Sequence, residues 1–248
     1  MKRSCLIPVL AALLFLVRIP AHADTVAVAA GLFPCVRELA DLYGECNGKA
    51  PNLVVGSSGK LASQIAAGAP FGLFLSANRE WIIFLEKKGL VVEYTDFATS
   101  PLVLWWPRKD PPDPRALGGD LRIAIVDPIL GPFGATARAY LEDAGLYDSL
   151  LREKRLIVAS TALQAALAAQ SGAADLAFTS MSVARKFSTD LRAQGSSLAL
   201  CGYDLTHAGA LIRGQATAGV EEFWRYLRSR EAVAVWRKWG FNVDREEE

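Results

Sequence analysis

Histidine is nearly absent from this chain: among its 248 residues only His22 and His207 carry an imidazole. Because His22 lies in an N-terminal segment that we expect to be removed, any mechanism that needs histidine depends on His207. A lone histidine is more often a structural residue than a general base. His207 and the three cysteines after residue 23 also lack the close spacing of metal ligands. The sequence therefore favours neither histidine-dependent catalysis nor a metal site.

Cysteine is scarce as well, and its number is odd once the N-terminal segment is set aside, since Cys35, Cys46 and Cys201 remain. Three thiols cannot all pair within one chain. Cys35 and Cys46 share a predicted helix, where their spacing in the sequence corresponds to roughly 16 Å, too far for a disulfide unless the helix ends early. A bridge from Cys201 to either one and a free, buried thiol both remain open.

The chain has no excess of charge of either sign. It contains 27 lysines and arginines and 26 aspartates and glutamates, and three of the basic residues lie within the first 23, which leaves 24 against 26. Such a balance excludes the bulk electrostatic attraction typical of nucleic-acid-binding proteins. Any anion that this protein binds is therefore held by local geometry and not by net charge.

Long apolar runs are absent except near the N-terminus. Lys2 and Arg3 precede an apolar stretch at residues 6–17, and the small-residue sequence Ala21-His22-Ala23 follows it. This order is typical of a secretory signal peptide, and the apolar stretch is too short for a comfortable membrane span. We therefore predict a signal peptide at residues 1–23, cleavage after Ala23, and an exported protein of about 225 residues.

Short apolar segments alternate with amphipathic ones through the rest of the chain. We predict strands at residues 25–29, 52–55, 71–75, 100–106, 121–127, 175–179 and 197–203, and helices at residues 33–43, 59–67, 79–88, 134–144, 162–171 and 220–239. This alternation is typical of an α/β fold with a mainly parallel sheet.

The extended runs at residues 100–106 and 197–203 enclose a self-contained block of strands and helices. We therefore expect the chain to cross into a second lobe and return, with residues 24–101 and 205–248 in lobe 1 and residues 102–204 in lobe 2. A cleft between two such lobes is a common ligand site.

The segment "VVGSSGKLASQIAAGAP" at residues 54–70 places a Gly-Ser-Ser-Gly turn before a predicted helix. It is not a phosphate-binding P-loop, which requires glycine in place of Val54 and serine or threonine in place of Leu61. It also lacks the Gly-x-Ser-x-Gly spacing of a serine hydrolase nucleophile. A secreted serine hydrolase that pairs a serine of this turn with His207 remains an alternative.

Small or hydroxylated residues mark several predicted helix starts: Gly31, Ser57 and Ser58, residues 132–134, and residues 160–161. The first amides of a helix have no partner within it, and together with the helix dipole they can bind an anion. Serine or threonine at such a position often serves only to cap the helix. Helix starts that follow the carboxyl ends of parallel strands nevertheless converge on one crevice, which predicts an anion site there.

Four segments give the chain a family resemblance: "TVAVAAGLF", "GSSGKLASQIAAGAPFGLFLSAN", "VDPILGPFG" and "FWRYLRSREAVAVWRKWGF". Through them the sequence resembles the molybdate-binding proteins of bacterial ABC transporters, which are periplasmic solute-binding proteins. The resemblance implies a two-lobed periplasmic-binding-protein fold of type II-like topology, each lobe a mostly parallel sheet flanked by helices, with the ligand cleft between the lobes. It also implies a periplasmic monomer that delivers its ligand to an ABC permease, with no enzymatic activity, cofactor or metal-cation ligands.

In this family a tetrahedral oxyanion, molybdate or tungstate, is held by hydroxyls and main-chain amides. The resemblance implies that the ligand-binding residues are Gly31, Ser57, Ser58, Phe133, Leu163 and Ser180. Gly31 stands where the family usually has serine, and Ser180 where well-known members have tyrosine. One alternative is therefore a diverged receptor of the same fold for another anion or a small organic acid. Another is a sensory role in which the closed form docks on a receptor.

Overall fold

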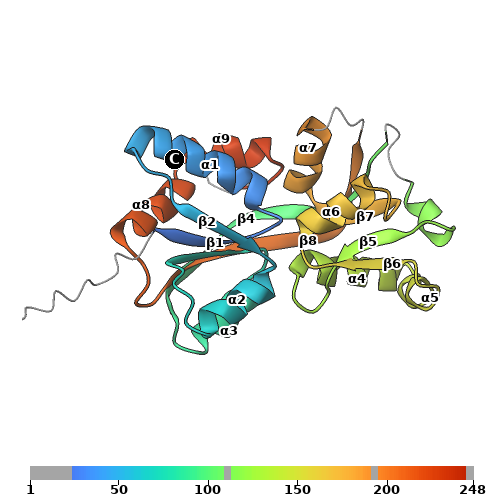
Figure 1. Cartoon of the computed structure of the whole chain (residues 1–248), viewed down its shortest axis with the longest axis horizontal. Helices are drawn as coiled ribbons and strands as arrows, with labels where there is room; N and C mark the ends of the chain where they lie inside the picture. The colour runs from blue at the N-terminus through green and yellow to red at the C-terminus, as the bar shows by residue number, and fades with distance from the viewer. Residues whose placement is uncertain (1–23, 109–112, 191–194, 244–248) are drawn as a thin grey trace, which may run out of the picture.

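The computed structural model describes residues 24–108, 113–190 and 195–243, and the predicted signal peptide at residues 1–23 lies outside them. Its framework is one eight-stranded mixed sheet with the strand order β2-β1-β3-β8-β4-β7-β5-β6. Helices cover both faces of this sheet (Figure 1). The predicted α/β fold is thus confirmed, and the sheet runs without a break from one lobe to the other.

One end of the sheet is built by the first three strand–helix units. β1 (Thr25–Ala29) lies between β2 (Asn52–Gly56) and β3 (Leu73–Ser76), and both pairings are parallel. Each strand is followed by a helix, namely α1 (Phe33–Asn47), α2 (Ser58–Ala66) and α3 (Glu80–Glu86). These elements lie where the sequence predicts them. α1 covers one face of the sheet, and α2 and α3 cover the other (Figure 1).

The other end repeats this construction. β5 (Ile123–Val126) lies between β6 (Leu156–Ala159) and β7 (Leu176–Ser180), again with parallel pairing. Its helices are α4 (Pro132–Asp143), α5 (Tyr147–Arg152), α6 (Ala162–Gln170) and α7 (Met181–Asp190), with a 3₁₀ helix at Pro114–Gly118. The sequence prediction missed β6, α5 and α7. β6 is a four-residue strand that follows charged residues, and α7 begins directly after β7 without a turn.

Two long antiparallel strands join the two ends of the sheet. β4 (Val91–Trp106) and β8 (Ser196–Ile212) pair along nearly their whole length, so the sheet is less parallel than predicted. The sequence predicts only parts of them, at residues 100–106 and 197–203. Residues 91–99 of β4 have mostly exposed and half-buried side chains. This part of the strand therefore lacks the apolar run that marks a buried strand.

The pairing of these long strands shifts at three points, and the largest shift lies between Pro101 and Leu102. Pro101 faces Asp204 but Leu102 faces Leu200, so residues 201–203 of β8 bulge out of the ladder, and Gly202 there has a φ of 83°. On one side of this point β8 pairs with β3, and on the other side β4 pairs with β7. A bulge disrupts the ladder and bends the strand, and this one lies between the two lobes.

The C-terminal helix predicted at residues 220–239 is instead two helices, α8 (Ala218–Leu227) and α9 (Arg230–Lys238). Ser229 separates them, because its hydroxyl accepts a hydrogen bond from the amide of Ala232 and so caps α9. Both helices pack against lobe 1 on the same face as α1 (Figure 1).

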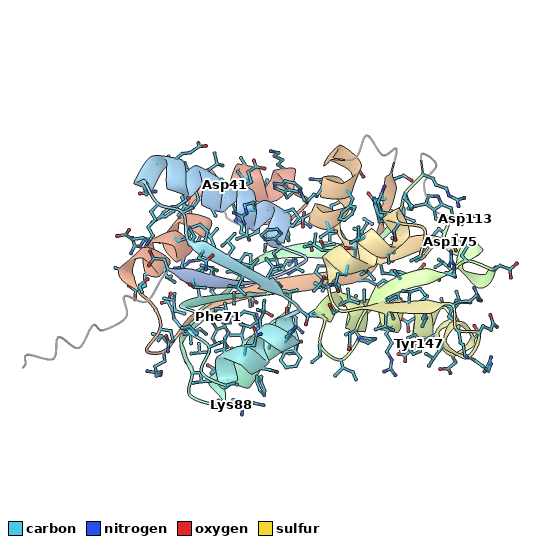
Figure 2. The ribbon with its side chains drawn as sticks, in the orientation of Figure 1. Asp41, Phe71, Lys88, Asp113, Tyr147 and Asp175 are labelled. Carbon is cyan, nitrogen blue, oxygen red and sulfur yellow. The ribbon has the colours of Figure 1, made fainter. Side chains whose placement is uncertain are left out.

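One large hydrophobic core runs through both lobes, and a smaller cluster lies between the sheet and helices α2 and α3. The largest fully buried side chains of the large core include Trp105, Trp224 and Trp236. Charged side chains such as Asp41 and Lys88 lie on the outside (Figure 2). Among the described residues, no helix combines the length and the apolar character needed to cross a bilayer.

The three described cysteines are all free thiols. Cys35 is buried, whereas Cys46 and Cys201 are exposed. The expectation that Cys35 and Cys46 do not pair is confirmed, and the structure has no bridge from Cys201 to either of them. Burial raises the pKa of the Cys35 thiol well above its usual range, so this residue is an inert part of the core.

Candidate functional site

The carboxyl ends of the parallel strands from both lobes meet at one cavity. β1, β2 and β5 end there, and helices α2, α4 and α6 begin there. The cavity has a volume of about 10 Å³, roughly the room needed for one water molecule. Its walls include Gly31, Ser57, Ser58, Ala77, Phe133 and Thr161. The convergence of helix starts predicted from the sequence is therefore present.

Lobe 1 contributes the start of α2. Ser57 is the N-cap residue, yet its side chain makes no capping hydrogen bond to the described helix, so the capping interpretation does not apply to it. Ser58 is only 1% exposed, and its Oγ accepts a hydrogen bond of 3.1 Å from the amide of Ala77. This bond uses a lone pair of the Ser58 oxygen and not its hydrogen, so the hydroxyl can still donate a hydrogen bond to another acceptor. The first-turn amide of Ser58 likewise has no acceptor within its helix.

Lobe 2 contributes the starts of α4 and α6. Pro132 is the first residue of α4, and Phe133 follows with a first-turn amide at the cavity. The hydroxyl of Thr161 accepts a hydrogen bond from the amide of Gln164, so this residue does cap α6. Ala162 is the α6 residue that lines the cavity, whereas the predicted ligand residue Leu163 is half-buried and packs against the core.

Ser180 has a different position from the one that the sequence suggested. Its Oγ lies 2.8 Å from the carbonyl oxygen of Gly31 and donates to it, and the Oγ of Ser182 donates to the same oxygen at 2.5 Å. Ser180 lies behind Gly31 and is not among the residues that line the cavity. Ser182 was not predicted from the sequence, although the run Thr179-Ser180-Met181-Ser182 at a predicted strand end is a visible signal.

Every residue that lines the cavity is uncharged. Hydrogen bonds to an ionised acceptor are stronger than those between neutral groups, so aligned hydroxyls and first-turn amides can bind an anion without a lysine or arginine. The described residues also contain no group of histidine, cysteine and carboxylate side chains that could hold a metal ion. The arrangement is therefore suited to a small anion.

A larger groove of about 720 Å³ adjoins the cavity at Pro132 and is less suited to an anion. Its charged residues are Arg79, Glu80, Asp96 and Asp204, and Arg79 is paired with Asp96. The remaining carboxylates give the groove a negative potential. The small cavity is therefore the better candidate for an anion site.

His207 is fully buried in β8, and its side-chain hydrogen-bond partner is Ser100, not Ser57 or Ser58. Its Nε2 lies 2.7 Å from the Oγ of Ser100 on β4, and the rings of Phe97, Phe133 and Phe241 surround it. Burial lowers the pKa of His207 to about 3, and the backbone of Ala77 acts weakly in the opposite direction. The imidazole is thus neutral and weakly basic, which fits a structural role between the two long strands.

The lowered pKa of His207 predicts a pH-dependent stability. An unfolded chain takes up this proton near pH 6.5, whereas the folded protein takes it up only near pH 3. The free energy of unfolding should therefore have its full value above about pH 6.5. It should decrease as the pH falls from there to pH 3, with a slope of up to about 1.4 kcal/mol per pH unit. Urea unfolding between pH 4 and pH 7 measures it. His207→Asn should have a flatter profile, and identical slopes in the two proteins would contradict the assignment.

Comparison with known proteins agrees with this geometry. The family model of the bacterial extracellular solute-binding proteins matches residues 25–242. The molybdate-binding protein ModA of Rhodobacter capsulatus is 31% identical over 235 residues, which cover 90% of each chain. ModA of Azotobacter vinelandii is 27% identical over 228 residues, covering 88% of this chain and 89% of the relative.

Solved structures show the same fold. The periplasmic molybdate-binding protein of Azotobacter vinelandii superposes with a TM-score of 0.82 at 26% identity, covering 89% of this chain and 99% of that one. The sulfate-binding protein SubI of Mycobacterium tuberculosis has a TM-score of 0.70 at 15% identity, covering 89% and 86%. The second likeness concerns the fold alone, so the nature of the ligand must be argued from the site.

Proposed function

The chain belongs to the bacterial extracellular solute-binding protein family and is homologous to the ModA proteins, and from this we propose that it binds molybdate or tungstate for an ABC importer. One observation carries the proposal: three helix starts from two lobes converge on a small cavity whose walls are uncharged. Such a site suits a compact dianion that accepts hydrogen bonds from all sides.

We assign the contacts as follows. The hydroxyls of Ser57 and Ser58 and the amides of Gly31, Ser58 and Phe133 donate to the oxyanion, because all four residues line the cavity. Leu163 contributes its first-turn amide only if α6 moves closer, since Ala162 lies nearer to the cavity. Ser180 holds Gly31 in place by donating a hydrogen bond to its carbonyl oxygen. It donates to the ligand only after that hydrogen bond breaks.

We further propose that the lobes move relative to each other about the bulge in β8, with the boundaries at residues 24–101 and 205–248 for lobe 1 and 102–204 for lobe 2. A ligand that contacts both lobes favours the conformation in which they touch. The protein acts as a monomer in the periplasm, after removal of residues 1–23, and presents the closed form to an inner-membrane permease. It carries out no covalent chemistry.

Isothermal titration of the purified mature protein tests this function. We expect saturable binding of molybdate and tungstate with one site per chain. The cavity of about 10 Å³ must widen to admit either oxyanion, and donors spaced for these larger ions hold sulfate with longer and weaker hydrogen bonds. Dialysis against buffer free of oxyanions precedes the titration, and circular dichroism verifies that the protein is folded. A folded, ligand-free protein that gives no heat with molybdate or tungstate would refute the assignment.

A further inference from the structure

The ring of Phe133 occupies the space in which a side chain at position 31 would lie. A Cβ built on Gly31 would be 2.9 Å from Cδ2 of Phe133 and closer still to Cε2, approaches that real Cβ atoms essentially never make. Residue 31 belongs to lobe 1 and residue 133 to lobe 2. The two residues therefore fit together across the lobes only because residue 31 lacks a side chain.

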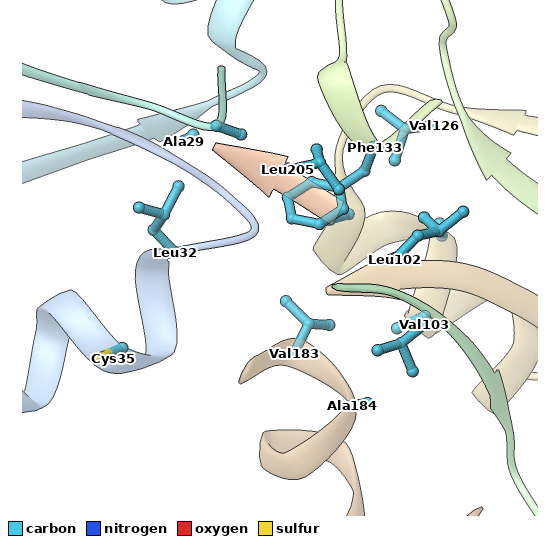
Figure 3. Packing of buried hydrophobic residues seen from close by; sticks show 14 of the residues in the cluster. Ala29, Leu32, Cys35, Leu102, Val103, Val126, Phe133, Val183, Ala184 and Leu205 are labelled. Carbon is cyan, nitrogen blue, oxygen red and sulfur yellow. The ribbon is translucent and has the colours of Figure 1, made fainter. Parts of the chain in front are cut away.

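Away from the cavity, the ring of Phe133 is closely packed. It is 3% exposed and packs in the core that also contains Leu32, Leu102 and Leu205 (Figure 3). The ring of His207 lies behind it, with 6.1 Å between the ring centroids. Protein interiors of this density resist displacement, since a shift of one buried ring requires its neighbours to move.

The backbone of Gly31 is held equally firmly. Its carbonyl oxygen accepts hydrogen bonds from Ser180 and Ser182, whose side chains are fully buried. On the other side, the amide of Leu32 donates to the carbonyl of Ala29 at 2.9 Å. A side chain at position 31 would have to break these bonds or displace the Phe133 ring.

Gly31 and Phe133 both line the anion cavity, so together they form one of its fixed walls. The neighbouring wall residues Ala29, Ala77 and Val126 are small, which leaves the phenyl ring as the group that limits the volume. We propose that the Gly31–Phe133 pair determines ligand size: it restricts the site to compact inorganic oxyanions and excludes tetrahedral anions that carry an organic substituent. This proposal rests on the oxyanion-binding function proposed above.

Phenylphosphonate tests the size limit directly. Phe133→Ala removes a phenyl ring beside the hydrogen-bond donors, and an apolar space of this kind can take up an aromatic ring. We expect phenylphosphonate to bind the mature Phe133→Ala protein at least tenfold more tightly than the wild type in isothermal titration. Phe178→Ala is the control, because it removes a fully buried phenyl ring from β7 that does not line the cavity. A folded Phe133→Ala protein without this gain would overturn the proposal.

A double-mutant cycle on molybdate binding tests the contact itself, because residues 31 and 133 belong to different lobes and meet when the lobes touch. Gly31→Ala should weaken molybdate binding to the wild type at least tenfold and to the Phe133→Ala protein much less, since the clashing ring is then absent. Equal losses in the two backgrounds would overturn the pairing. The two proposals remain distinguishable. A folded wild type that binds no molybdate or tungstate refutes the proposed function, whereas a wild type that binds molybdate, together with a Phe133→Ala protein that gains no affinity for phenylphosphonate, refutes only the size limit.

Discussion

Replacing Ser58 by alanine should weaken molybdate binding by about 10- to 150-fold, because a hydrogen bond to a charged group contributes about 1.5 to 3 kcal/mol. The hydroxyl of Ser58 is positioned for this task by the amide of Ala77, whose hydrogen bond occupies one of its lone pairs. Isothermal titration of the mature Ser58→Ala protein with molybdate measures the loss.

Ser63→Ala is the matched control for this experiment. Ser63 lies one turn further along the same helix, where its hydroxyl donates to the carbonyl of Gly59 at 2.8 Å, away from the cavity. The loss of Ser58 also leaves the buried amide of Ala77 without its acceptor, which should destabilise the protein by about 1 to 3 kcal/mol. Thermal unfolding without ligand therefore accompanies the titration. If a folded Ser58→Ala protein binds as tightly as the wild type, Ser58 is not a ligand residue.

The sequence was sufficient to predict which helix starts form the site. Small or hydroxylated residues marked the helix starts at Gly31, at Ser57 and Ser58 and at residues 132–134, and the family resemblance singled out Phe133. All four residues line the cavity. This worked because the signal is local: a buried strand, a short turn and a helix follow one another within a few residues. The convergence of the helix starts could also be predicted, since it follows from the topology of parallel strands.

The contacts across the lobes could not be predicted in the same way. Whether Ser180 donates to a ligand or to Gly31 depends on two residues that are 149 positions apart. The same holds for the choice between Ala162 and Leu163, which depends on how far α6 is rotated about its axis. A resemblance in sequence assigns residues to a site, but rotations of a helix and contacts between lobes are decided by packing.

The long strands β4 and β8 show a second limit of sequence patterns. In β4 the predicted part, residues 100–106, is mostly buried and the part that was missed is mostly exposed or half-buried. In β8 the predicted part, residues 197–203, is mostly exposed or half-buried, and the missed residues 207–212 are buried. β-propensity depends on the neighbouring strand as much as on the residue itself. Antiparallel pairing between two segments about a hundred residues apart is therefore visible only in the folded chain.

Gly59→Ala should reduce the affinity for molybdate by about 5- to 150-fold although residue 59 contributes no side chain to the site. The amide of Gly59 in α2 donates to the carbonyl of Leu130 in lobe 2 at 2.8 Å. A Cβ at this position would lie 2.5 Å from Cζ2 of Trp81 and 2.9 Å from that same carbonyl oxygen. Crowding of this kind costs about 1 to 3 kcal/mol. The contact with Trp81 lies within lobe 1 and is present in either form, whereas the contact with the Leu130 carbonyl arises only when the lobes touch.

The turn that carries Leu130 cannot easily retreat from this clash. Asp127 shapes it, because its Oδ1 accepts hydrogen bonds from the amides of Ile129 and Leu130. The higher helix propensity of alanine and the contact with Trp81 act in both forms, whereas the clash with the Leu130 carbonyl acts only in the closed form. The same substitution therefore favours the separated form and disfavours the closed one, and the apparent affinity falls with the population of the closed form.

Two measurements separate this effect from loss of a ligand contact. In small-angle X-ray scattering, molybdate should reduce the radius of gyration of the wild type at concentrations that leave Gly59→Ala expanded. Much higher concentrations should restore closure in the variant, because the ligand contacts themselves are intact. Lys60→Ala, at the adjacent exposed position of the same helix, should behave like the wild type in both respects. Unchanged affinity and equal contraction in Gly59→Ala would mean that the Gly59–Leu130 contact is not part of ligand capture.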